Sequence, residues 1–301
     1  MRVAVTGPGG RLGRALMAAL GDAPFTGAAG PIGWGRPDFD LDDPSAAARL
    51  VQRDRPELVI HPAAWTDTES CAREPDLCRR RNGDATGALA TACAAGGVDL
   101  VVISTNEVFD GRRGDSQGYS PDDTPNPINP YGASKLAGER AAQEAFRGAG
   151  SVLAIVRTAW LYGPPGNDFP AKILAAADRA RQAGEPLRVV GDEIGSPTFA
   201  PDLAEAIVEL AGSDSVQGVH HMVNAGAVSR AGWARELLRQ CGLDVPIEEI
   251  SAATWTRASA APAWAVLQPT PLPGGEPLRP WQAALADYVP TLLRPRPAGA
   301  R

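Results

Sequence analysis

The chain has 301 residues, of which 44% are hydrophobic and 21% charged, a balance typical of globular proteins with one large or two modest domains. The formal net charge of −6 excludes a general nucleic-acid binder, because no basic stripe is present to neutralise phosphates. No apolar run is long enough for a membrane span, and the N-terminal residues lack the arrangement of a signal peptide, so we expect a cytoplasmic protein without a membrane partner.

The four cysteines and three histidines show none of the spacings of a metal site. The sequence contains no CxxC pair and no HExxH motif. We therefore expect structural thiols and no bound metal. Because acidic residues are plentiful, a metal at a subunit contact stays open.

A glycine-rich turn follows the first predicted strand. The β-branched run that ends at Thr6 breaks into glycines spaced by three residues and then into an Ala/Leu-rich segment, 14–20, that predicts a helix. In a strand, turn and helix of this kind, the first glycine allows the tight turn, the second lets the backbone approach a pyrophosphate, and the third lets the helix pack on the strand. The turn predicts a dinucleotide site formed by Gly7, Gly9, Gly10, Arg11, Leu12 and Gly13.

The second strand, 27–35, is weakly marked and ends at Arg36. An NAD enzyme usually places an acid at this strand end, whereas a guanidinium suits the 2′-phosphate of NADPH. We therefore favour NADPH as the cofactor, with NADH as the alternative. Asp40 and Leu41 are expected at the adenine end, and Asp42 or Asp43 is expected to cap a helix through residue 51.

The next strands end in small or polar residues. The apolar run 57–61 leads into Pro62 and small side chains that leave room for flat rings, and a helix over 75–96 follows. The run 100–103 leads into hydroxyl groups, and the carboxyl edge of a parallel sheet is where ligands bind. These segments add Ala63, Ala64, Trp65, Asn82 and Ser104 to the expected cofactor site.

Tyr131 and Lys135 lie four residues apart in a segment that predicts a helix. They therefore share one face, and both side chains can point into one site. A free phenol has a pKa of about 10, so a neighbouring ammonium group would be needed to lower it. Taken alone, this pair is typical of an exposed helix. The other motifs favour a proton-donor site.

Five alternations of strand and helix up to residue 163 predict an α/β fold with a doubly wound, Rossmann-type parallel sheet. Beyond that point the pattern changes. We expect residues 1–163 to form a dinucleotide-binding domain to which 199–226 returns. Residues 164–198 and 227–301 would form a smaller substrate-binding lobe.

Five segments together resemble the extended short-chain dehydrogenase/reductase superfamily, and within it the dTDP-4-dehydrorhamnose reductase family. They are the glycine turn, Ser104–Thr105, Tyr131–Lys135, Arg157–Trp160 and Gly195–Thr198. The resemblance implies that NADPH reduces C4 of a nucleotide-linked 4-keto-6-deoxy sugar, most simply dTDP-4-dehydrorhamnose, in rhamnose biosynthesis. Thr105, Tyr131 and Lys135 would be catalytic, with Lys135 lowering the tyrosine pKa and binding the nicotinamide ribose. A homodimer is possible.

The resemblance also implies that the sugar nucleotide is bound by Asn106, Glu107, Trp160, Asn167, Phe169 and Thr198. At two points the chain departs from the family. Asn106 and Glu107 replace an Asp and a Tyr, and an arginine expected near Ala261, suited to the diphosphate, is missing without an obvious substitute.

Two other functions stay open. A sugar-nucleotide epimerase or dehydratase would recycle a tightly held cofactor. A dehydratase would need an acid beside Thr105, and Glu107 could be read that way, but its one-residue offset and opposite strand face argue against it. A non-catalytic regulatory subunit that binds NADP or a sugar nucleotide fits the altered residues but not the retained Tyr131 and Lys135.

Overall fold

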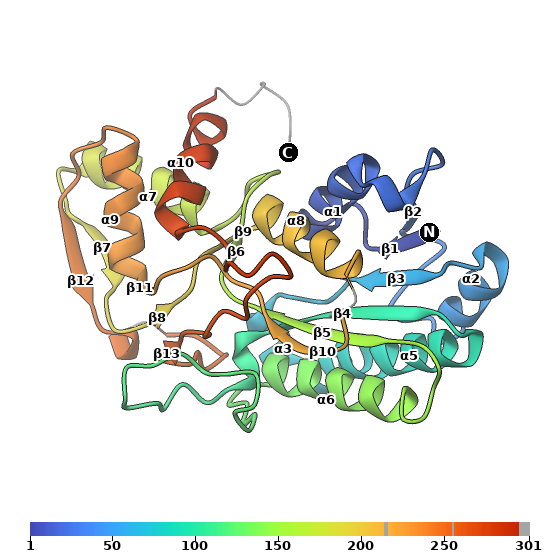
Figure 1. Ribbon diagram of the computed structural model, residues 1–301. Coiled ribbons are helices and arrows are strands. Elements are labelled where there is room, and N and C mark those ends of the chain that lie inside the picture. The colour runs from blue at the N-terminus through green and yellow to red at the C-terminus, as the bar shows by residue number, and fades with distance from the viewer. Residues whose placement is uncertain (214–215, 255, 295–301) are drawn as a thin grey trace.

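The computed structural model describes residues 1–213, 216–254 and 256–294. Trp255 and residues 295–301 of the predicted lobe lie outside the described residues. At the centre is a six-stranded parallel sheet in the order β10-β5-β4-β3-β1-β2 (Figure 1). Its strands are β1 (Val3–Thr6), β2 (Ile32–Trp34), β3 (Leu58–His61), β4 (Asp99–Thr105), β5 (Leu153–Thr158) and β10 (Gly218–His221).

Helices cover both faces of this sheet, so the predicted doubly wound α/β fold is confirmed. On one face α1 (Arg11–Asp22) packs against α8 (Ala200–Ala211). On the other lie α2 (Ala46–Asp54), α5 (Ala85–Gly96) and α6 (Pro130–Ala145). Because both faces are covered, the central strands are continuous apolar runs rather than alternating ones.

The chain order creates a switch point between β1 and β3. From β1 the chain crosses to β2 on one side and then returns to β3 on the other. The loops that leave β1 and β3 therefore diverge at the carboxyl edge of the sheet, which is where ligands bind in open α/β sheets. The glycine turn is the first of these two loops.

Several local expectations were wrong. Helix α2 begins at Ala46 rather than after Asp42 or Asp43, because the Asp43 carboxylate accepts a hydrogen bond from the Ser45 backbone N–H (2.9 Å) and forms a local turn instead. The helix predicted over 75–96 has the expected bounds, but it is divided into α4 (Pro75–Cys78), a π-helical segment (Arg79–Asp84) and α5. A further helix, α3 (Thr68–Arg73), was not predicted. The side chain of Asp67 caps it.

Most of the remaining elements form a smaller body beside the sheet, at the left of Figure 1. Its helices α7 (Phe169–Ala183), α9 (Arg230–Gln240) and α10 (Trp281–Leu292) pack around a second apolar core that contains Trp233, Tyr162 and Tyr288. Of the short 3₁₀ turns, η4 (Ala252–Thr254) belongs to this part of the chain, whereas η1 (Pro24–Thr26) follows α1 and η3 (Asn106–Val108) follows β4. The strands of the smaller body are β6 (Leu161–Tyr162), β7 (Leu187–Val190), β8 (Ile194–Gly195), β9 (Thr198–Phe199), β11 (Val228–Ser229), β12 (Ile247–Ile250) and β13 (Trp264–Ala265).

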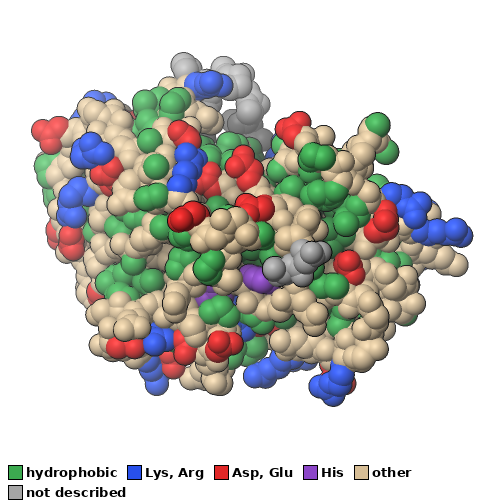
Figure 2. Space-filling view, viewed as in Figure 1, with side chains coloured by type: hydrophobic (Ala, Val, Ile, Leu, Met, Phe, Trp, Pro, Cys, Tyr) green, Lys and Arg blue, Asp and Glu red, His purple; other side chains and the backbone are tan. Residues whose placement is uncertain are grey.

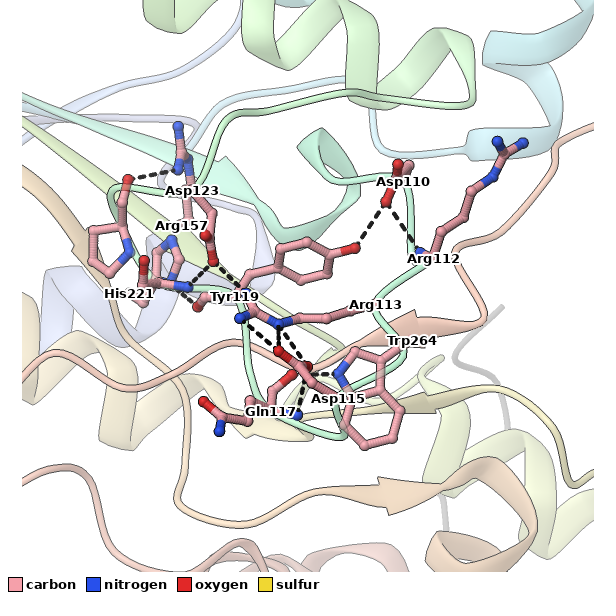
Figure 3. A network of polar contacts seen from close by, with 12 residues as sticks. Asp110, Arg112, Arg113, Asp115, Gln117, Tyr119, Asp123, Arg157, His221 and Trp264 are labelled. Atoms are coloured by element: carbon pink, nitrogen blue, oxygen red, sulfur yellow. Dashed lines mark hydrogen bonds and ion pairs between the residues drawn. The ribbon is translucent and has the colours of Figure 1, made fainter.

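A long loop after β4 ties the sheet to this smaller body (Figure 3). The Trp264 indole N–H donates to the carbonyl oxygen of Gln117 (2.7 Å), and Arg113 forms ion pairs with Asp115 and Asp123. Tyr119 forms an isolated bridge with Leu267. The loop therefore fixes residues 260–268 next to the carboxyl ends of the strands.

The described helices do not include one with the length and apolar composition that a membrane crossing needs. Acidic and basic side chains are mixed over the face of the molecule drawn in Figure 2.

Candidate active site

A cavity of about 550 Å³ lies at the carboxyl ends of the central strands and is lined from both parts of the molecule. Most of the predicted site residues line it: Gly7, Gly10, Arg11, Leu12, Gly13, Ala64, Ser104, Thr105, Asn106, Glu107, Tyr131, Lys135, Trp160 and Phe169. The others are absent from its lining: Gly9, Arg36, Asp40, Leu41, Ala63, Trp65, Asn82, Asn167 and Thr198.

The glycine turn forms one end of the cavity. Gly7 has a φ of 58°, in the region that favours glycine, and a Cβ on Gly13 would lie 2.1 Å from the Gly7 carbonyl oxygen. Helix α1 then starts without a side-chain cap and without an acidic residue in its first turn. Its first N–H groups are therefore available to an anionic ligand, and the turn fits a pyrophosphate.

The Arg11 side chain also connects the glycine turn to a second loop. Its guanidinium donates to the carbonyl oxygens of Gly163 (3.0 Å) and Gly166 (3.0 Å). It thereby joins the start of α1 to the loop between β6 and α7.

Polar side chains outside the cavity hold the loop after β3 in place through hydrogen bonds to its backbone. The Ala63 N–H donates to the Thr6 hydroxyl (3.2 Å), which also contacts Nδ1 of His61 (2.8 Å). The Asn82 amide accepts from the Trp65 N–H (2.7 Å) and donates to the Trp65 carbonyl oxygen (2.9 Å). The Asn82 side chain therefore bonds the backbone of Trp65 with both its oxygen and its nitrogen, and it supports the loop without lining the cavity.

The residues expected around the adenine end lie outside the cavity lining. Arg36 is exposed, and its guanidinium forms no hydrogen bond or ion pair within the described ranges. The Asp40 carboxylate accepts from the Asp42 N–H (3.0 Å), and Asp42 pairs with Arg81 (2.6 Å), which stacks on Trp65.

Helix α6 places Tyr131 and Lys135 on the cavity wall. Asn129 caps the helix by accepting from the Gly132 N–H (2.7 Å), which puts Tyr131 in the first turn and Lys135 one turn later. Burial lowers the pKa of Lys135 to about 8, against an opposing effect of the Glu139 charge.

In the free protein the pKa of Tyr131 is raised overall, and the expected lowering of this pKa by Lys135 stays a prediction. Burial raises the pKa of Tyr131 above its ordinary value, and the nearby Glu107 charge raises it further, while the Thr105 hydroxyl acts in the opposite direction. The phenol therefore stays protonated at neutral pH. This is the form that can donate a proton to a developing alkoxide.

Ser104 lies beneath these side chains and belongs to a buried network. Its hydroxyl donates to Glu139, and Glu139 also accepts from Arg157 Nε (3.0 Å) and Nη2 (2.7 Å). This network joins β4, β5 and α6 at the point where α6 carries Lys135.

The expectation that Glu107 lies on the opposite strand face, away from the site, was wrong. Strand β4 ends at Thr105, and residues Asn106–Val108 form a 3₁₀ turn, so the two-residue alternation no longer applies. Glu107 lines the same cavity as Thr105. Burial raises the pKa of its carboxyl group.

The far wall is aromatic and basic. Trp160 has a φ of 41°, rare for a bulky residue, and a Cβ on Gly195 would lie 2.5 Å from its ring. The Arg230 guanidinium lies 4.1 Å from the centre of this ring and pairs with buried Glu193 (2.9 Å). Lys172 of α7 also lines the cavity.

Two basic residues that the sequence did not single out, Lys172 and Arg230, therefore line the cavity, so candidates to replace the missing arginine are present. Neither belongs to a motif with a fixed spacing. The sequence held one hint of a site residue here, which was the position of Arg230 at the start of α9. A cation at a helix N-terminus is unfavourable for the helix dipole, so its presence suggests a role in binding. The other lining residues that were missed are Pro62, Thr66, Thr68, Ile103, Thr158, Ala159, Leu161 and Trp233.

Two predicted substrate contacts, Asn167 and Thr198, do not line the cavity. Asn167 is exposed, with a φ of 64°, in the loop before α7. Thr198 is completely buried, and its hydroxyl donates to the Ser196 carbonyl oxygen (3.3 Å). In the part of the chain that the structure describes, no group of three or more His, Cys, Asp or Glu side chains is placed to hold a metal ion.

Comparison with known proteins gives a consistent result. The family model described as "RmlD substrate binding domain" matches residues 1–294. A dTDP-4-dehydrorhamnose reductase of Mycobacterium tuberculosis strain H37Rv is 36% identical over 96% of this chain and 92% of its own length.

Two solved structures are also similar. The dTDP-4-dehydrorhamnose reductase of Clostridium acetobutylicum has a TM-score of 0.88 and 29% identity, covering 98% of this chain and 100% of that one. The Bacillus anthracis enzyme of the same name, in complex with NADP, has a TM-score of 0.85 and 32% identity, covering 96% and 99%.

Proposed function

Because the chain belongs to the RmlD substrate binding domain family, within the extended short-chain dehydrogenase/reductase superfamily, we propose that Thr105, Tyr131 and Lys135 catalyse a reduction at this cavity. The chain is an NADPH-dependent oxidoreductase that reduces the C4 keto group of dTDP-4-dehydrorhamnose to give dTDP-rhamnose. The observation that carries the proposal is that one cavity holds the glycine turn at one end and Tyr131 with Lys135 on its wall.

The residues of the cavity fit NADPH. Bound NADPH would supply the hydride for C4. The free N–H groups at the start of α1 hold the pyrophosphate, since Gly7 and Gly13 let the backbone come close. Outside the cavity lining, the exposed guanidinium of Arg36 would suit the 2′-phosphate.

Three side chains handle the proton. Tyr131, which burial keeps protonated, donates its proton to the oxygen on C4 as negative charge develops there. The Thr105 hydroxyl donates a hydrogen bond to the same oxygen and orients it. Lys135, when charged, stabilises the tyrosinate that remains and binds the nicotinamide ribose.

Lys172 and Arg230 suit the diphosphate of the substrate. Both line the cavity, and Arg230 is held in place by Glu193 and by the ring of Trp160. A guanidinium oriented in this way can bind phosphate oxygens through its remaining N–H groups. Phe169 would then contact the sugar nucleotide from the start of α7. The homodimer and the cytoplasmic location stay predictions.

The test is to mix the purified protein with dTDP-4-dehydrorhamnose and NADPH and to follow the NADPH absorbance. We expect one NADPH to be consumed for each sugar reduced, with slower consumption of NADH. An epimerase or dehydratase that recycles its cofactor would consume none on balance, and a non-catalytic binding subunit would leave the sugar unchanged. Either result would contradict the proposal.

A further inference from the structure

The carboxyl group of Glu107 has one occupied oxygen and one free oxygen. Asn129 Nδ2 donates to Oε2 (2.6 Å). No described residue forms a hydrogen bond or ion pair with Oε1, and this atom is absent from the fully buried unpaired atoms. Because Glu107 lines the cavity, its free oxygen is accessible from the cavity.

The position of this carboxyl group is fixed. Asn129 is buried, with 4% of its surface exposed, and its side chain also caps α6 and donates to the Ala260 carbonyl oxygen (2.8 Å). A Cβ on Gly132 would lie 2.0 Å from the Glu107 carbonyl oxygen, so the first turn of α6 rests directly on this residue. Glu107 and Tyr131 are thus held together by the same helix start.

The nearby cations are already paired with another acid. Arg230 and Arg257 both bind Glu193, and neither forms an ion pair with Glu107. Their charges still act on Glu107 from a distance, against the effects of burial and of Glu193. Oε1 of Glu107 is therefore a fixed hydrogen-bond acceptor to which no described residue donates.

The chemistry of the substrate determines what this acceptor can bind. A carboxylate repels the diphosphate, so it must face the sugar. The sugar carbons next to C4 are C5, which carries a methyl group, and C3, which carries a hydroxyl. Tyr131 acts on the oxygen of C4, and it lies in the first turn of α6, which rests directly on Glu107 and lines the same cavity. The C3 hydroxyl is therefore the sugar donor that we place against Glu107.

We propose that Glu107 accepts a hydrogen bond from the C3 hydroxyl of the sugar and makes the enzyme specific for hexoses that carry it. This inference rests on the proposed function and adds a specificity-determining residue to it. A site built to bind a hydroxyl group discriminates strongly against an analogue without one, because the buried acceptor is then left unpaired.

The experiment compares kcat/KM for dTDP-4-dehydrorhamnose and for its 3-deoxy analogue, in the wild type and in Glu107→Gln. We expect the wild type to prefer the 3-hydroxy sugar by about 100-fold and the Gln variant by about tenfold or less. Binding of dTDP alone checks that the variant is folded and should stay unchanged. Should Gln disturb the fold, Glu107→Asp, which retracts the carboxylate by one carbon, is expected to weaken the preference in the same direction.

The outcomes separate this proposal from the proposed function. An unchanged preference in a variant that still binds dTDP would overturn the role of Glu107 and leave the reductase intact. A wild type that oxidises NADPH with neither sugar would overturn both. The reaction is repeated in D₂O: deuterium at C3 or C5 that depends on Glu107, above the level without enzyme, would make this residue a base acting on carbon and would contradict the proposal.

Discussion

Burial sets the protonation of the two side chains proposed to move the proton. Burial raises the pKa of Tyr131 and lowers the pKa of Lys135 to about 8. The uncharged phenol and the uncharged amine are therefore each more favoured in this site than they would be in water. At neutral pH the phenol is protonated and most of the lysine is still charged. This is the pair of states that a reductase needs before it donates a proton.

The pH dependence of kcat/KM follows from these values. As the pH rises through about 8, Lys135 loses its charge in the free enzyme and can no longer stabilise the tyrosinate. We expect kcat/KM to be constant below this pH and to fall tenfold per pH unit well above it. The Lys135→Met variant should be slow throughout and show no such fall. A wild-type profile that stays flat to pH 9.5 would contradict this role.

At the scale of residues, sequence reasoning found groups that local patterns mark. Most residues of the glycine turn line one cavity together with Tyr131 and Lys135, the pair marked by its four-residue spacing. Arg230 and Lys172 could not be found in this way, because the tertiary packing of α7 and α9 brings them to the site. Glu107 was misplaced because the end of β4 could not be located to one residue.

At the scale of elements, one buried ion pair joins β5 to α6. The side chains of Arg157 and Glu139 are only 4% and 2% exposed, and Glu139 also accepts from Ser104. Removing one partner of such a pair leaves the other charge buried and uncompensated. We expect Glu139→Gln to lower the free energy of unfolding by about 3–5 kcal/mol, measured by urea denaturation.

The matched control for this substitution lies on the same helix. Glu144 pairs with Arg147, but their side chains are 65% and 76% exposed, and exposed pairs contribute about 0–1 kcal/mol. Glu144→Gln should therefore change the unfolding free energy little. If the two substitutions lowered the free energy of unfolding equally, burial of the Glu139 ion pair would not explain the effect, and the prediction would be contradicted.

The contact between α1 and the turn before it allows a second test on an element. A Cβ on Gly13 would overlap the Gly7 carbonyl oxygen, whereas a Cβ on Gly9 would meet nothing within 4 Å. We expect Gly13→Ala to lower stability by about 1–3 kcal/mol and to weaken NADPH binding at least tenfold, because the turn must shift. Gly9→Ala should do neither. Tight NADPH binding by Gly13→Ala, measured by fluorescence titration, would contradict the pyrophosphate assignment.

Elements with a strong pattern were the ones that could be predicted. The central strands are short apolar runs that end in turn residues, and the helices between them have an apolar face. The start of α2 was misjudged because Asp43 binds Ser45 locally. The π-helical segment around Asn82 has no signature in the sequence, since its shape depends on contacts with α6 and the loop after β3.

At the scale of the whole molecule, the parallel sheet follows from the alternation of strands and helices, but the smaller body does not. Its strands are two to four residues long and pair across distant segments, as β7 does with β12 and β8 with β11 and β13. Such pairings carry no local signal. The division of the chain into a cofactor domain and a substrate lobe stays a proposal. It would explain why the cavity is lined by residues from both predicted parts.

The central claim is that this cavity transfers hydride to C4 while Tyr131 supplies the proton. The most direct test uses NADPH deuterated at its transferable position with dTDP-4-dehydrorhamnose, and locates the label in the product by NMR. The account predicts one deuterium at C4 of dTDP-rhamnose and a rate lowered by about 10²–10⁴ in Tyr131→Phe, with dTDP binding unchanged. Product without the label at C4, or a Tyr131→Phe variant as fast as the wild type, would contradict it.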